Sequence, residues 1–137
     1  MEAVELEAAD EASVVALWAS NNLTRPWNDP AADYSRAVFG PTSAVLGLKD
    51  ARDIVGTVMV GHDGHRSWMY YLAVRQGHQR RGYGRLLVSA AETWLRNRGA
   101  VKVQLMVRSE NTGVLHFYED CGYEHSDVQV LSRWLKD

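Results

Sequence analysis

The stretch SWMYYLAVRQGHQRRGYGRLLVSAAETWL, residues 67–95, predicts a strand, a turn and a helix in succession. Residues 67–74 form an apolar, aromatic-rich run, which is typical of a buried strand. Residues 77–85 hold three glycines and three arginines, and residues 83–98 carry apolar side chains at helical spacing. A glycine-rich basic turn at the start of a helix indicates a phosphate site, because the helix presents unpaired N–H groups and a positive dipole end there.

Two nucleotide-binding loops fit this turn poorly. Gly77 and Gly82 have the spacing of a nucleotide P-loop, but Tyr83 and Gly84 replace its lysine and its hydroxyl residue. Gly82 and Gly84 match the first pair of a dinucleotide fingerprint, but Leu87 takes the place of the third glycine. The next strand also lacks the terminal acidic residue that would bind a ribose. The spacing therefore argues against both loops.

Size and composition limit the class of protein. With 137 residues, 46% of them hydrophobic and 23% charged, we expect one globular domain spanning 1–137. The net charge of −2 argues against a nucleic-acid-binding protein. The single cysteine, Cys121, fits a reducing cytoplasm. The acidic N-terminus has no signal-peptide pattern and no apolar run approaches the roughly 20 residues of a membrane span, so we expect a cytoplasmic location and no membrane partner.

The other segments extend the strand–turn–helix pattern in both directions. Short polar links between consecutive strand-like runs favour antiparallel hairpins. We expect strands at 2–8, 43–49, 53–60, 67–74, about 101–107 and two within 123–135, and helices after Asp10 and at 30–39, 83–98 and 111–120. This order, β-α-α-β-β-β-α-β-α-β-β, predicts a mixed α/β fold with a single central, mostly antiparallel sheet of about six to seven strands flanked by about four helices. The terminal strands would leave an edge with which a second copy can pair, giving a homodimer.

Two motifs carry a family resemblance. The segment QRRGYG, residues 79–84, resembles the [QR]-x-x-G-x-[GA] motif of the GNAT N-acetyltransferase superfamily. The segment NTGVLHFYEDCGY, residues 111–123, resembles the later motif of that family, and it follows in the family's order. The segments around 17–33 and 55–66 are similar to small bacterial YpeA-type members. The resemblance covers nearly the whole chain and implies a GNAT fold and an acetyl-CoA-dependent N-acetyltransferase without a metal.

The resemblance also implies where coenzyme A binds. In this family the glycine turn wraps the pyrophosphate with backbone N–H groups, the preceding strand pairs with the pantetheine arm and offers an N–H to the thioester oxygen, and an asparagine and a tyrosine lie near the arm and the sulfur. The implied coenzyme residues are Leu72, Ala73, Val74, Gln79, Arg80, Arg81, Gly82, Tyr83, Gly84, Arg85, Asn111 and Tyr118. The arginines can equally be solvated charges, Asn111 can equally be a helix N-cap, and residues 67–74 can simply be a buried strand.

The implied reaction is direct attack of an amine on the acetyl thioester. Tyr118 is then the general acid for the departing thiolate, since a phenol with a reference pKa near 10 carries a proton at neutral pH; its alternative role is a core residue. Cys121 fits a small core residue better than a nucleophile.

His62, Asp63 and His65 form a titratable cluster that could supply a general base. His65, however, lies about 20 Å along the strand from Leu72, and Asp63 begins a good hairpin turn. A water relay past Tyr70 or Tyr71 is our preferred route for the amine proton.

The first helix–loop–helix is the usual acceptor side of the family. A small amine that carries a carboxylate would contact Arg25, Trp27, Asn28, Asp29, Arg66 and Tyr70. Asn28 and Asp29 can equally serve as ordinary helix-start residues. Two other functions stay open: acetylation of a protein N-terminus or lysine, and a coenzyme A-binding sensor without turnover.

Overall fold

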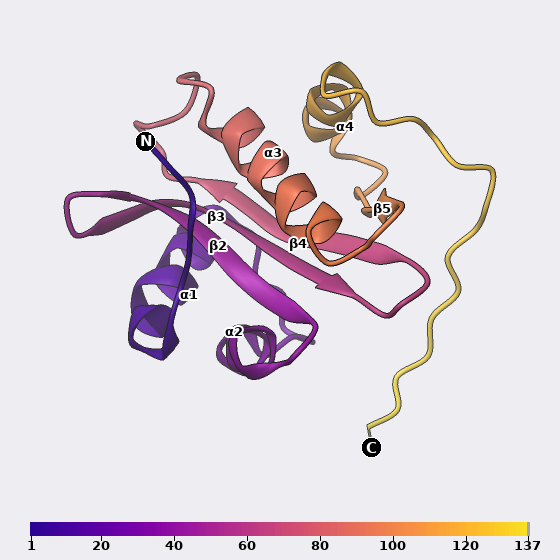
Figure 1. The fold of residues 1–137 in the computed structure, drawn as a ribbon, viewed down its shortest axis with the longest axis horizontal. Helices are drawn as coiled ribbons and strands as arrows, with labels where there is room; N and C mark the ends of the chain where they lie inside the picture. Colours follow the sequence, from indigo (N-terminus) through magenta and orange to yellow (C-terminus); the bar gives the residue numbers. More distant parts are fainter. Residues whose placement is uncertain (137) are drawn as a thin grey trace. The chain divides into compact units, whose positions relative to one another are not determined.

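The computed structural model describes residues 1–136 and divides into two compact units, residues 1–106 and the residues from 107 onward. The helices and strands are labelled in Figure 1. The first unit contains β1 (Val4–Glu5), the 3-10 helix η1 (Ala8–Asp10), α1 (Glu11–Ser20), α2 (Pro30–Phe39), β2 (Ser43–Asp50), β3 (Asp53–His62), β4 (Ser67–Val74), α3 (Tyr83–Arg96) and β5 (Val103–Gln104), and the second contains α4 (Thr112–Asp120).

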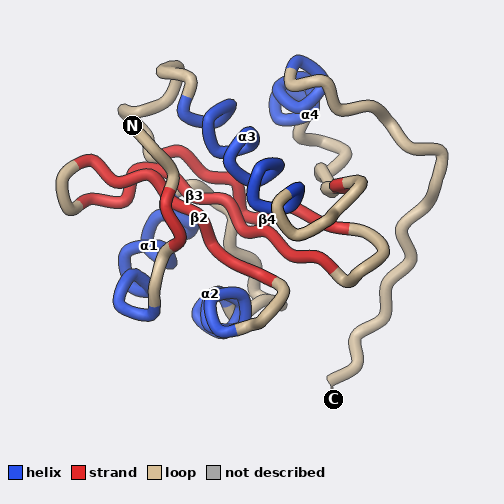
Figure 2. Tube along the Cα trace, in the orientation of Figure 1, coloured by secondary structure: helices blue, strands red, loops and turns tan. Residues whose placement is uncertain are grey.

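One sheet organises the first unit, with strand order β1-β2-β3-β4-β5. Figure 2 shows the strands in red. The first four strands pair antiparallel, and β5 pairs parallel to β4. The β4–β5 pairing covers only the start of β4, where Ser67 pairs with Val103 and Trp68 with Gln104. The strands therefore separate from this point on.

The connection between β3 and β4 is a turn built around one carboxylate. Asp63 Oδ1 accepts hydrogen bonds from the backbone N–H groups of His65 and Arg66, each at 2.8 Å, and Gly64 has φ +92°. These hydrogen bonds hold the pKa of the Asp63 carboxyl below its usual range. The Asp63 side chain thus serves the hairpin, as the turn interpretation predicts.

Helices cover both faces of the sheet: α1 and α2 lie on one face and α3 on the other (Figure 1). Trp18 of α1 is fully buried; its ring stacks on Tyr71 with centroids 3.8 Å apart and meets Tyr34 edge-on at 6.1 Å. On the α3 face the buried side chains are Leu87, Val88, Ala91, Trp94 and Leu95, which follow the three- to four-residue spacing of an amphipathic helix. In the described residues no helix is long and apolar enough to cross a membrane.

The predicted fold class is confirmed, with four α-helices and a mixed, mostly antiparallel sheet. The helix predicted at 30–39 has the predicted bounds, because Asp29 caps it and Pro30 occupies its first position. The long helix begins at Tyr83 and ends at Arg96, two residues before the predicted end, and the helix predicted at 111–120 is α4.

Two predicted strands are shorter than expected and the two predicted within 123–135 do not form, so the sheet has five strands instead of six to seven. The strand predicted at 2–8 is reduced to Val4–Glu5, since the chain turns into η1 at Ala8. The strand predicted at 101–107 pairs only at Val103–Gln104, because β4 offers partners only at its start. Residues 121–136 form no strand, and side chains such as Leu131 and Leu135 are exposed. Alternation gives a strand tendency, but a strand also needs a partner. The homodimer expected from that edge stays a prediction.

The cap of α2 gives a stability test. Asp29 Oδ1 accepts a hydrogen bond from the Ala32 N–H at 3.1 Å. We expect Asp29→Ala to lower the free energy of unfolding by about 1 kcal/mol in urea denaturation. Asp29→Asn keeps an oxygen acceptor and should retain most of that stability. An equal loss in both variants would mean that the negative charge, and not the hydrogen bond, is what stabilises the helix start.

Candidate active site

A β-bulge interrupts β4 where the neighbouring strand β5 has already ended. The β3–β4 register shifts between Thr57 and Met59, so that two residues of β4, Tyr71 and Leu72, oppose one residue of β3. Tyr71 has φ +53°, a left-handed conformation that is uncommon for a residue other than glycine. In the described chain no strand pairs with residues 69–74 on the β5 side. The bulge therefore lies beside an open edge.

The backbone direction along β4 follows from one hydrogen bond. The Arg75 N–H donates to the Val55 carbonyl of β3 at 2.8 Å. Because backbone groups alternate in direction along a strand, Ala73 also faces β3, whereas Leu72 and Val74 face the open edge. Of the three residues predicted for the pantetheine arm, Leu72 offers its backbone groups there and Val74 its N–H, and Ala73 offers none.

At the end of this edge, two side chains bond to the last backbone carbonyl of β4. The Val74 carbonyl accepts hydrogen bonds from Asn21 Nδ2 at 2.9 Å and from Gln79 Nε2 at 3.1 Å. Asn21 lies at the end of α1, and Gln79 belongs to the predicted turn motif. Gln79 thus ties the turn to the strand before it, a structural role that needs no ligand.

The turn between β4 and α3 contains three left-handed residues: Gly77 at φ +90°, Arg80 at φ +65° and Gly82 at φ +81°. Left-handed residues among right-handed ones aim successive N–H groups to one side and create a concave anion site. Gly82 is the N-cap of α3, and no side chain caps this helix. A Cβ added at Gly82 would meet no atom within 4 Å, so the space beside the backbone is open. Open space beside N–H groups at a helix start fits a phosphate.

The other predicted turn residues surround this backbone. Arg80, Arg81 and Arg85 are exposed, and Tyr83 and Gly84, in the first turn of α3, are half-buried. The turn also rests against the β2–β3 hairpin. There His78 Nε2 lies 3.7 Å from Asp50 Oδ2, and Arg75 Nη1 lies 3.8 Å from Asp53 Oδ2. These surface pairs offset part of the positive charge near the turn.

The acceptor candidates of the first unit are mostly occupied by local structure. Arg25 Nη1 donates to the carbonyls of Asn22 at 2.7 Å and Thr24 at 3.0 Å. Asp29 is the cap of α2, and the backbone N–H of Asn28 donates to the Arg25 carbonyl. The two aromatic candidates are more open: Trp27 is 47% exposed and Tyr70 41% exposed.

The remaining candidates sit at the β3–β4 hairpin and on β4. Arg66 Nη1 donates to the His65 carbonyl at 3.0 Å. Tyr70 stacks on Trp68 with ring centroids 6.4 Å apart. The structure thus brings an aromatic pair together on β4, and sequence reasoning had named one member, Tyr70, without the other.

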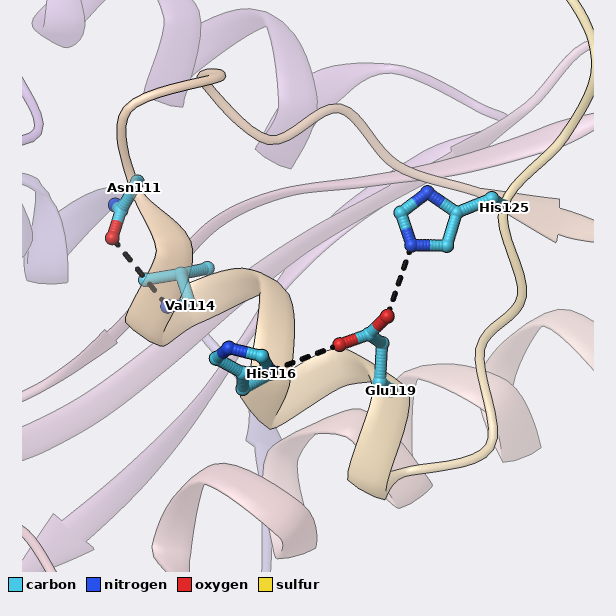
Figure 3. Close-up of polar contacts among 5 residues, drawn as sticks. All are labelled: Asn111, Val114, His116, Glu119 and His125. Atoms are coloured by element: carbon cyan, nitrogen blue, oxygen red, sulfur yellow. Dashed lines mark hydrogen bonds and ion pairs between the residues drawn. The ribbon is translucent and has the colours of Figure 1, made fainter.

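In the second unit, Asn111 and Tyr118 lie on α4. Asn111 is its N-cap, with Oδ1 accepting from the Val114 N–H at 3.4 Å (Figure 3). Tyr118 is only 8% exposed, and its ring packs edge-on against Phe117 and Tyr123. Burial, together with the nearby Cys121 thiol, raises the pKa of Tyr118 to about 12. The phenol therefore keeps its proton throughout the neutral range.

One carboxylate of the same helix, that of Glu119, contacts two histidine side chains. Glu119 contacts His116 Nδ1 at 3.1 Å and His125 Nε2 at 3.0 Å (Figure 3). These hydrogen bonds lower the pKa of the Glu119 carboxyl. Among the described residues there is no group of three or more His, Cys, Asp or Glu side chains that could hold a metal ion.

Sequence reasoning missed the side chains that hold the bulge. Thr57 Oγ1 accepts from Trp18 Nε1 at 2.9 Å and donates to the Tyr71 carbonyl at 3.1 Å. The Tyr71 hydroxyl donates to Asp33 Oδ2 at 2.8 Å. Burial and this carboxylate raise the pKa of Tyr71 well above its usual value. A threonine in VGTVMV gives no sequence signal for such a role, because it reads as an ordinary strand residue.

An open strand edge at a bulge, followed by a left-handed turn at a helix start, is the arrangement expected for coenzyme A. The sequence model of the acetyltransferase (GNAT) family matches residues 12–123, most of the chain. The chain belongs to the GNAT acetyltransferase family. GNAT enzymes use acetyl-CoA as the acyl donor, so this enzyme is a transferase.

Solved structures of acetyltransferases share the fold at low sequence identity. A putative acetyltransferase from Agrobacterium tumefaciens str. C58 is 17% identical, with 98% of this chain and 100% of that chain covered and a TM-score of 0.82. The ribosomal-protein-alanine N-acetyltransferase from Brucella melitensis biovar Abortus 2308 is 17% identical over 97% and 99% of the chains, with a TM-score of 0.78. The aminoglycoside N-acetyltransferase AAC(6')-Iy in complex with CoA is 14% identical over 98% and 95%, with a TM-score of 0.83.

Proposed function

We propose that this GNAT enzyme transfers the acetyl group of acetyl-CoA directly to a primary amine of a small metabolite, and that it is one of the small bacterial YpeA-type members. We further propose that residues 1–137 act as a single domain. The family match at 12–123 supports this, since it runs across the boundary between the two compact units at residue 106.

The observation that carries the proposal is the open edge of β4 at the bulge. The edge directs the backbone groups of Leu72 and the N–H of Val74 away from β3, which fits strand-like pairing with a pantetheine arm, whereas the Val74 carbonyl is already bonded to Asn21 and Gln79. The Leu72 N–H then donates to the thioester oxygen, where negative charge develops during attack. Acetyl-CoA supplies the activated acyl group, and the chain supplies position and hydrogen bonds.

The turn before α3 would hold the pyrophosphate by its backbone. Gly82 and Gly84 let the chain approach the phosphates closely, and the left-handed residues of the turn direct N–H groups to one side. Arg80, Arg81 and Arg85 add positive charge near the phosphates. Gln79 acts by fixing the turn to β4, and Tyr83 by starting α3 at the site.

On α4 we assign Asn111 to the pantetheine arm and Tyr118 to the thiolate. The cap hydrogen bond uses Asn111 Oδ1, so the amide nitrogen is the group assigned to the ligand. Tyr118 donates its proton to the departing sulfur, and its high pKa ensures that the proton is present.

The acceptor would lie against Trp27 and Tyr70, with Arg25, Asn28, Asp29 and Arg66 around it. The exposed aromatic rings suit the apolar part of a small amine, and the arginines suit a carboxylate. The ammonium proton leaves through a water relay past Tyr70 or Tyr71. The hydrogen bond of Tyr71 to Asp33 gives such a relay a carboxylate at its end.

The function is tested by thiol release from acetyl-CoA across a panel of small amines, amino acids and peptides. We expect thiol release with one class of small amine and none with peptides. Thiol release with peptides only would show that the acceptor is a protein and not a small metabolite. Thermal stabilisation by acetyl-CoA with no release on any member would identify a coenzyme A-binding sensor and overturn the proposed catalysis.

Two glycines at opposite ends of α3 allow a matched test of the turn. Gly82 and Gly99 have φ of +81° and +83°, and an added Cβ meets nothing within 4 Å at either. Alanine therefore imposes similar backbone strain at both, about 1–2 kcal/mol. We expect Gly82→Ala to weaken acetyl-CoA binding by about tenfold or more in calorimetry, because the turn shifts to relieve the strain. Equal affinity in the Gly82 and Gly99 variants would exclude this turn as the pyrophosphate site.

The role of Tyr118 is tested by removing one oxygen. We expect Tyr118→Phe to lower kcat by on the order of 100-fold with the acetyl-CoA affinity nearly unchanged. Tyr123→Phe, in the neighbouring ring, is the control and should leave kcat intact. The acid is active while protonated, so a pKa of about 12 predicts no loss of wild-type kcat through Tyr118 ionisation until the pH approaches that value. A Tyr118→Phe enzyme with wild-type kcat would remove the acid role.

A further inference from the structure

Thr57 lies on β3 beside the bulge and is completely buried, as is Trp18. Its hydroxyl takes part in two hydrogen bonds, from Trp18 Nε1 at 2.9 Å and to the Tyr71 carbonyl at 3.1 Å. The indole N–H can only donate, so it occupies a lone pair of the hydroxyl. The single hydroxyl proton is thereby left for the Tyr71 carbonyl. The direction of both hydrogen bonds, from Trp18 to Thr57 and from Thr57 to Tyr71, is therefore fixed.

The position of that carbonyl determines the direction of the next N–H group. All peptide bonds described in the chain are trans, and in a planar trans peptide the carbonyl of one residue and the N–H of the next point in opposite directions. Since the Tyr71 carbonyl points at the Thr57 hydroxyl, the Leu72 N–H points away from that hydroxyl. The alternation along β4, in which Arg75 and Ala73 face β3, places this N–H on the other side of the strand. This is the open edge of β4, where β5 no longer pairs.

The unusual backbone of Tyr71 needs such support. A residue other than glycine at φ +53° is strained and persists only when its surroundings hold it. Tyr71 is held at three points: its carbonyl by Thr57, its ring by stacking on Trp18 at 3.8 Å, and its hydroxyl by Asp33. Trp18 acts twice, since it also orients the Thr57 hydroxyl.

We propose that Thr57 is a positioning residue for acyl transfer: its hydroxyl, oriented by Trp18, holds the Tyr71 carbonyl and so aims the Leu72 N–H at the thioester oxygen. This inference rests on the proposed function. Thr57 itself touches neither substrate; it sets the direction of the group that does. Without the hydroxyl, the buried indole N–H of Trp18 and the carbonyl of Tyr71 both lose this partner, and the strained peptide can rotate.

The test compares Thr57→Val, which removes the hydroxyl at nearly constant size, with Thr57→Ser, which keeps it. We expect Thr57→Val to lower kcat by about tenfold or more, since a misplaced oxyanion donor stabilises the transition state poorly. The KM for acetyl-CoA should change little, because the pyrophosphate turn is intact. Thr57→Ser should restore most of kcat. Trp18→Phe keeps an aromatic ring on Tyr71 and removes the N–H that orients the Thr57 hydroxyl. It tests the same pair of hydrogen bonds should Thr57→Val not fold.

Ser67 gives a matched control on β4. Like Thr57 it is a completely buried hydroxyl residue that donates to a backbone carbonyl, that of Lys102, but it lies at the far end of β4 from the bulge. We expect Ser67→Ala to lower the melting temperature and leave kcat near wild type.

A second readout is the ¹H–¹⁵N resonance of the Leu72 amide. This resonance should shift on acetyl-CoA binding in the wild type and much less in Thr57→Val.

The outcomes separate this inference from the function on which it rests. Wild-type enzyme that neither binds acetyl-CoA nor releases thiol overturns the proposed function. Active wild-type enzyme together with a Thr57→Val variant of unchanged kcat overturns the positioning role alone. The role also fails if Ser67→Ala, at a similar loss of melting temperature, lowers kcat as much as Thr57→Val, because the effect would then be one of general stability.

Discussion

The hydrogen bond from the Thr57 hydroxyl to the Tyr71 carbonyl is the constraint on which the candidate site depends. It holds a bulge in β4 at a left-handed residue, and through the planarity of one peptide it sets the direction of the Leu72 N–H. Thr57 is completely buried and its hydrogen bond to Tyr71 is partly buried, which limits competition from water. It also links two layers of the fold, because the indole that orients the hydroxyl belongs to α1, under the sheet. The geometry of the open edge is therefore set by the core beneath it.

The two ends of the open edge are fixed by different means. At the bulge a buried side-chain network holds the peptide, whereas at the end of the strand Asn21 and Gln79 both donate to the Val74 carbonyl. α1 therefore contributes at both ends, through Trp18 and Asn21. An edge held in this way is preorganised, and a ligand that pairs with it gains hydrogen bonds without first ordering the strand.

The sequence was most informative where local chemistry decides structure. A cap at Asp29, a proline at the next position and a regular apolar spacing were enough to predict α2 and α3. Strand lengths were overestimated, because alternation in residues 101–107 and 123–135 says nothing about whether a partner edge exists. The two motifs led to the coenzyme turn and to α4, but the roles of Thr57 and Asp33 depend on contacts between residues 14 and 38 positions apart. No local pattern encodes those contacts.

The basic side chains of the turn contribute less to phosphate binding than their number suggests, because acidic side chains lie nearby. Carboxylates of the β2–β3 hairpin lie beside the turn, with Asp50 close to His78 and Asp53 close to Arg75. They reduce the net charge that an incoming phosphate meets, and exposed arginines are further screened by salt. Backbone N–H groups keep their partial charge at any ionic strength, and Gly77, Arg80 and Gly82 hold them in place. Phosphate recognition at this turn should therefore depend mainly on backbone conformation, which explains why a glycine substitution is a sharper probe of it than an arginine substitution.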